Sequence, residues 1–169
     1  MVFNNDLLHD FAGLWNLKSV GGNFSIKDNP LLESLHGAHN LDQVGGNLKI
    51  RDNQALLSLA GFASLNSVGG NLSIQFNESL TNLGLSALQN VGSYVFVHGH
   101  PLLENLQGLE SLSTVGGFVK IADNAVLNDV YGIANLACLH EGGSCAGVCN
   151  TYNSTASCQC DQGCFSEGD

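Results

Sequence analysis

Apolar residues recur along most of the chain with a period of about 24 residues. An asparagine, replaced once by histidine, marks the same place in each repeat: Asn5, Asn29, Asn53, Asn77, His100 and Asn124. A leucine follows each mark by three residues without exception: Leu8, Leu32, Leu56, Leu80, Leu103 and Leu127. Further apolar positions follow six and about twelve residues after the mark. A repeat this short buries its apolar residues only by stacking on its neighbours, so the pattern predicts a solenoid of about six coils.

Each repeat also contains a strand-like segment, such as VGGNLSIQFN at 68–77. Leu72 and Ile74 alternate there with polar residues, which is typical of a half-buried strand. A helix of about ten residues would leave little room in the repeat, so we expect short strands joined by tight corners and an all-β fold. The paired glycines indicate a corner that needs either a positive φ or close stacking of the chain.

The column of marking residues has a structural interpretation of its own. An asparagine side chain both donates and accepts, so at one corner of every coil it can bond backbone groups of its own and the adjacent coil. We therefore expect a ladder that satisfies polar groups buried by stacking. His100 takes the place of asparagine in the fifth position of this ladder.

The repeated pattern VGGNLxIxxNxxLxxLxGLxxLxSV resembles the receptor L-domain repeats of insulin and epidermal-growth-factor receptors and of microbial surface proteins. The resemblance covers about residues 2–139 and gives a predicted domain at 1–139. It implies a right-handed, leucine-rich β-solenoid. No ligand-binding residue of those receptors can be matched here, so the resemblance predicts no particular ligand.

All six cysteines lie between residues 138 and 164, which predicts a disulfide-rich module at 138–169 in an oxidising compartment. Their spacing resembles an epidermal-growth-factor-like module, and lacks the paired C-x2-C of structural zinc sites. The resemblance implies the pairs Cys138–Cys149, Cys145–Cys158 and Cys160–Cys164. The last pair stays open because its loop is shorter than usual in the family. An extracellular or cell-surface location follows, with Asn153 as the expected glycosylation site.

Charge narrows the classes of partner. The chain has 5 Lys and Arg against 15 Asp and Glu, a formal net charge of −10, which argues against nucleic acids and anionic membranes. No apolar run is long enough for membrane insertion of this segment, and the start, MVFNNDLLHD, shows no signal peptide. Because the chain begins near the end of a predicted strand, we expect either a longer chain or a first coil covered by another molecule.

The outward strand positions change character along the solenoid. The early coils carry mainly Asn, Ser, Lys and Arg, whereas the later ones carry Tyr94, Phe96, His98 and Phe118. Exposed aromatic residues on a polar sheet usually mark a contact surface, so these four residues are the candidate partner surface. The alternative is that the cysteine-rich segment folds over them.

Two further sets of residues, a histidine pair and a column of aspartates, are candidates for metal binding or catalysis. His98 and His100 lack a third ligand, so no metal site or cofactor is predicted. Asp28, Asp52 and Asp123 occupy one column and could act as acid–base residues of a polysaccharide-cleaving enzyme, which is the third hypothesis for function. We interpret them instead as turn residues. The leading hypothesis is a non-enzymatic extracellular recognition or adhesion module for a protein or glycan. The alternative is a building block of an extracellular filament, wall or appendage that self-associates end to end.

Overall fold

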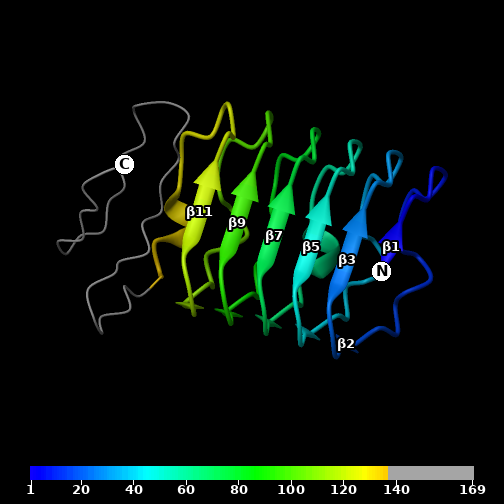
Figure 1. The fold of residues 1–169 in the computed structure, drawn as a ribbon, viewed down its shortest axis with the longest axis horizontal. Helices are drawn as coiled ribbons and strands as arrows, with labels where there is room; N and C mark the ends of the chain where they lie inside the picture. Colours follow the sequence, from blue (N-terminus) through cyan, green and yellow to red (C-terminus); the bar gives the residue numbers. More distant parts are fainter. Residues whose placement is uncertain (137–169) are drawn as a thin grey trace.

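The computed structural model describes residues 1–136, and this part is an all-β solenoid of about five turns (Figure 1). One parallel sheet has six strands: β1 (Val2–Phe3), β3 (Phe24–Lys27), β5 (Leu48–Arg51), β7 (Leu72–Gln75), β9 (Val95–His98) and β11 (Val119–Ala122). A second parallel sheet has five strands: β2 (Ser19–Val20), β4 (Gln43–Val44), β6 (Ser67–Val68), β8 (Asn90–Val91) and β10 (Thr114–Val115). The predicted fold class is confirmed for this part of the chain.

Several predictions concern residues 137–169 and lie outside the described residues. They are the epidermal-growth-factor-like module, all six of its cysteines and the glycosylation site Asn153.

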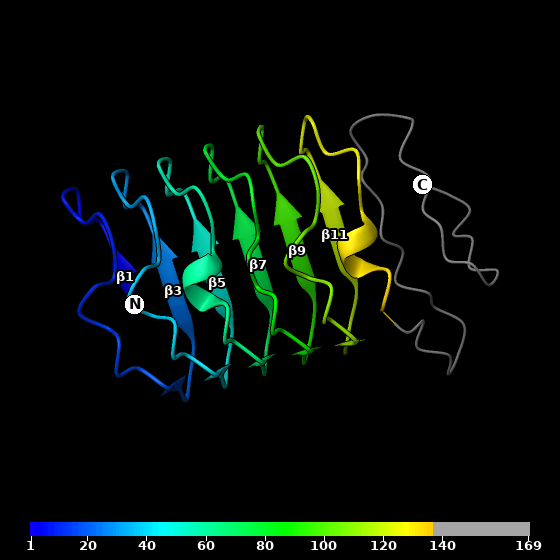
Figure 2. The ribbon, with the colours of Figure 1, turned by 180° about the vertical axis from the view of Figure 1, so that it is seen from behind.

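Consecutive coils superimpose with the register that the repeat predicts. Ile50 pairs with Ile74, and Ile74 with Val97, so the inward residues of the larger sheet form columns through the core. Leucines three residues after the mark are fully buried in the middle coils, as Leu56 and Leu80 illustrate. On the reverse side lie the longer connections and two short 3-10 helices, η1 (Ala60–Phe62) and η2 (Tyr131–Ile133) (Figure 2).

The glycine pairs are explained by close stacking and not by a positive φ. A Cβ on Gly45 would lie 2.5 Å from the carbonyl oxygen of Gly21, one coil earlier. A Cβ on Gly46 would lie 2.4 Å from Oδ1 of Asn23. Neither glycine has a left-handed backbone. Side chains are excluded here because adjacent coils approach too closely to hold them.

Candidate binding surface

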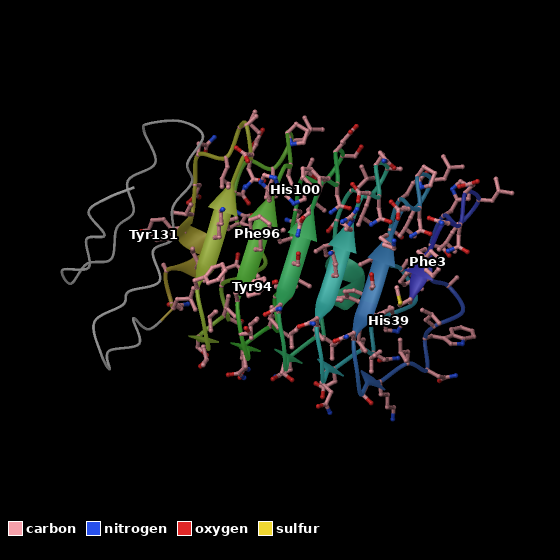
Figure 3. The ribbon with its side chains drawn as sticks, in the orientation of Figure 1. Phe3, His39, Tyr94, Phe96, His100 and Tyr131 are labelled. Carbon is pink, nitrogen blue, oxygen red and sulfur yellow. The ribbon has the colours of Figure 1, made fainter. Side chains whose placement is uncertain are left out.

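The predicted outward aromatic residues do face away from the core. Val95 and Val97 of β9 are buried, so alternation places Phe96 on the outer face of the six-stranded sheet. Tyr94 precedes β9 and Phe118 precedes β11. Phe118 is 48% exposed, whereas Tyr94 and Phe96 are half-buried. Figure 3 shows Tyr94 and Phe96 on the broad face of the sheet, at β9.

The rings contact one another in two stacked pairs. Tyr94 and Phe118 lie on adjacent coils with ring centroids 5.0 Å apart and an interplanar angle of 4°. Phe96 and His98 lie along β9 with ring centroids 5.3 Å apart and an interplanar angle of 10°. Such pairs contribute about 0.5–1.5 kcal/mol beyond burial of their area, so they hold the rings in one arrangement.

His98 points outward, as predicted, and is fixed on two sides. Its Nδ1 lies 3.1 Å from Oδ2 of Asp123 and 3.2 Å from the carbonyl oxygen of Ala122. The ring of Phe76 meets it edge-on, with centroids 4.8 Å apart. The imidazole is therefore oriented by the neighbouring coils on both sides.

Phe76 is the member of this surface that the sequence analysis missed. It occupies the corner position where other coils have Asn4, Asp28, Asp52 and Asp123, all with a left-handed φ of 54–56°. Asn and Asp tolerate this conformation, which confirms the aspartates as turn residues. Phe76 adopts it too, with φ of 51°, at a cost of about 1 kcal/mol or more for a bulky residue. The signal available in the sequence was a phenylalanine in a column of Asn and Asp.

Gly99 makes the conformation of Phe76 sterically possible. It is the corner residue of the next coil, and a Cβ there would lie 2.6 Å from Cδ1 of Phe76. The phenyl ring thus spreads over a glycine and remains 43% exposed. We call Phe76, Tyr94, Phe96, His98 and Phe118 the aromatic cluster.

A second ladder of asparagines ends where the aromatic cluster begins. Oδ1 of Asn23 accepts the backbone N–H of Asn47 at 2.8 Å, and Oδ1 of Asn47 accepts that of Asn71 at 2.8 Å. Oδ1 of Asn71 accepts the N–H of Tyr94 at 3.3 Å. Tyr94 has no amide to continue the series, and its ring stacks on Phe118 instead. The change from asparagine to aromatic residues therefore gives up a backbone-supporting role.

The predicted ladder of marking residues is confirmed inside the solenoid. Asn29, Asn53, Asn77 and His100 are 0% exposed, and Asn124 is 2% exposed. Asn53 illustrates the bonding, because its Oδ1 accepts from Nδ2 of Asn29 at 3.0 Å, while its Nδ2 donates to the carbonyl oxygen of Ile26 at 3.2 Å. Asn5, in the first coil, is exposed.

His100 reproduces the bonding of an asparagine with its two ring nitrogens. Nδ1 lies 3.4 Å from the backbone nitrogen of Asn77 and Nε2 lies 3.2 Å from the carbonyl oxygen of Ile74. Nδ1 also lies 3.2 Å from the carbonyl oxygen of Asn77, so each ring nitrogen has a carbonyl within reach. With its proton on Nε2, the neutral ring donates to Ile74 and accepts from the N–H of Asn77. Desolvation by burial lowers the pKa of His100 below its ordinary value of 6.5, against the opposing effect of its backbone hydrogen bonds.

The lowered pKa of His100 predicts a loss of stability in acid. The unfolded chain binds this proton at a higher pH than the folded one, so the free energy of unfolding falls as the pH decreases below 6.5, through the folded pKa. The loss amounts to about 1.4 kcal/mol for each pH unit by which folding lowers the pKa. We expect His100→Asn, which restores the ladder amide, to remove this loss. Urea unfolding between about pH 5 and pH 8 measures it.

The matched control for this prediction is His36→Asn, because His36 is exposed. This variant should keep the acid sensitivity of the wild type. Equal pH dependence in the His100→Asn and wild-type proteins would show that His100 is not responsible.

The described part of the chain offers no other conspicuous chemistry. Residues 1–136 contain no group of three or more His, Cys, Asp and Glu positioned to hold a metal ion. The same residues form no helix with the length and hydrophobicity of a membrane span. No protein-family model, curated protein or solved structure matches the chain.

Proposed function

We propose that the protein is a non-enzymatic recognition or adhesion module of the extracellular space, which binds its partner through the aromatic cluster. The observation that carries this proposal is the presence of aromatic rings, half-buried or exposed, at outward positions that the fold fills elsewhere with polar residues. Ser25 and Lys49 occupy in earlier coils the place of Phe96, with the same strand geometry. The fold therefore does not require an aromatic residue there.

Local strain supports the same proposal. Phe76 adopts a left-handed backbone that Asn or Asp would adopt more readily, yet it remains 43% exposed. Strained backbone conformations cluster at sites that contact ligands. The resemblance of the repeats to receptor L domains and the cysteine-rich C-terminal segment support an extracellular setting.

The proposal is tested with the triple variant Tyr94→Ser, Phe96→Ser, Phe118→Asn. Burial of such rings against a partner contributes about 1–3 kcal/mol each. We therefore expect the variant to keep its melting temperature and to lose binding by more than about a hundredfold. Binding is measured on immobilised extracellular glycans and proteins, and on intact cells.

The matched control replaces three exposed apolar residues outside the aromatic cluster: Trp15→Ser, Leu57→Ser and Tyr131→Ser. This control should bind like the wild type. A large loss of stability in the aromatic variant would instead indicate that the cysteine-rich segment covers the rings. Concentration-dependent fibres in sedimentation, abolished by the same variant, would favour the filament alternative. An aromatic variant unchanged in stability, binding and assembly would refute the proposal.

A further inference from the structure

The basic residues of the chain are distributed unevenly over the solenoid. Of its five Lys and Arg, all but Lys18 lie on strands of the six-stranded sheet: Lys27, Lys49, Arg51 and Lys120. All four alternate with buried residues and so project from the outer face. The strands of this sheet contain no Asp or Glu, although the chain has 15. The basic side chains therefore gather on one face of an acidic protein, with Asp28, Asp52 and Asp123 at the corner that follows the strands.

Two of these cations lie in a straight row with the aromatic cluster. The register places Lys49 beside Ser73, Ser73 beside Phe96, and Phe96 beside Lys120. Three strand spacings separate the two lysine backbones, or roughly 14 Å. Nζ of Lys120 lies 5.6 Å from the centroid of the Phe96 ring. Ser73 faces outward in this row but is only 7% exposed, and its hydroxyl accepts a hydrogen bond from Nε2 of Gln75 on the same strand.

The same two lysines are free of carboxylate partners within the described part of the chain. Lys27 and Arg51 contact the adjacent corner residues Asp28 and Asp52. No such contact within 4 Å is formed by Lys49 or Lys120 to residues 1–136. Within residues 1–136, no carboxylate therefore neutralises their charges.

We infer that this row binds a linear acidic polysaccharide that carries a carboxylate on each sugar. The inference rests on the proposed function and names the class of ligand. Lys49 and Lys120 would pair with carboxylates, while Phe96 and its aromatic neighbours would pack against the apolar faces of sugar rings. The coil spacing is close to the length of one sugar, so a polymer lying along the solenoid axis meets successive coils in register.

The density of charge favours a polysaccharide over a nucleic acid. Duplex DNA carries one negative charge per about 1.7 Å and requires many cations to bind. Four cations on this face, two of them paired with aspartates, suit a polymer with sparse charge. Repulsion from the other carboxylates of the protein is screened beyond about 8 Å at physiological salt, whereas direct contacts with Lys49 and Lys120 are screened much less.

The test measures the affinity of the full chain for polygalacturonate at physiological ionic strength. We expect binding by the wild type, and a loss of about tenfold or more for Lys49→Glu and for Lys120→Glu. Lys18→Glu changes the net charge by the same amount, but Lys18 lies outside the six-stranded sheet. The affinity of this variant should therefore stay within about twofold of the wild type. Phe96→Ser should also weaken binding, and neither neutral dextran nor duplex DNA should bind comparably. Melting temperatures confirm that each variant is folded.

The inference would be wrong if the wild type did not bind polygalacturonate. It would also be wrong if Lys18→Glu lowered the affinity as much as Lys49→Glu, or if the wild type bound duplex DNA as tightly as polygalacturonate. Concentration-dependent association that Lys49→Glu abolishes would assign the face to a second copy of this acidic chain and would equally overturn it. The proposed function would survive these results if the aromatic triple variant lost binding to cells and the Lys49→Glu variant kept it.

Discussion

Replacing Leu56 by alanine is expected to lower the free energy of unfolding by about 2–5 kcal/mol. Leu56 is 0% exposed and lies in a column between Leu32 and Leu80, which are 0% exposed as well. The cavity left by the truncation cannot close easily, because strand pairing fixes the coils above and below it. Chemical denaturation measures the change.

The neighbouring leucine provides the control for this experiment. Leu57 is 54% exposed, so Leu57→Ala should change the free energy of unfolding by less than about 0.5 kcal/mol. The two variants remove the same atoms from adjacent residues. Similar losses of stability from both would contradict the register of the solenoid.

The columns of the solenoid were predictable because the same physical requirement is repeated in every coil. A residue that stacks on its own copies must satisfy the same neighbours each time, so Leu32, Leu56 and Leu80 carry the same side chain. The ladder containing Asn53 was predictable for the same reason. Repetition makes a structural role visible without an alignment.

Features that depend on departures from the repeat were harder to predict. Strand alternation predicts an outward Ser73, yet it is only 7% exposed: it lies between the longer cross-strand residues Lys49 and Phe96, and Gln75 donates to its hydroxyl. Phe76 departs from the column of Asn and Asp at its corner position. Its place in the aromatic cluster depends on Gly99, one coil further on. Such effects arise between unlike residues, which periodicity cannot reveal.

Net charge also concealed a local property. The formal net charge of −10 describes the whole chain, which is acidic. It does not show that basic residues such as Lys49 and Lys120 share one face of one sheet. Strand register brings them into a row.

Replacing Asn53 by alanine is expected to destabilise the fold by about 3 kcal/mol or more, since each buried polar group left unpaired costs about 1–3 kcal/mol. Oδ1 of Asn53 accepts from the backbone and side-chain nitrogens of Asn29 at 3.3 and 3.0 Å. Its Nδ2 donates to the carbonyl oxygens of Ile26 and Arg51 at 3.2 and 3.0 Å. Asn53 is 0% exposed, so bulk water does not reach these groups in its place.

A variant of similar volume separates lost hydrogen bonds from lost packing. Asn53→Leu keeps the size of the side chain but removes its donors and acceptors, so it should destabilise about as much as Asn53→Ala. Asn128→Ala removes an exposed amide and should change the free energy of unfolding by less than about 0.5 kcal/mol. If Asn53→Leu unfolded at the same urea concentration as the wild type, the ladder would be dispensable. Asn53 would then contribute only by filling space between its neighbouring coils.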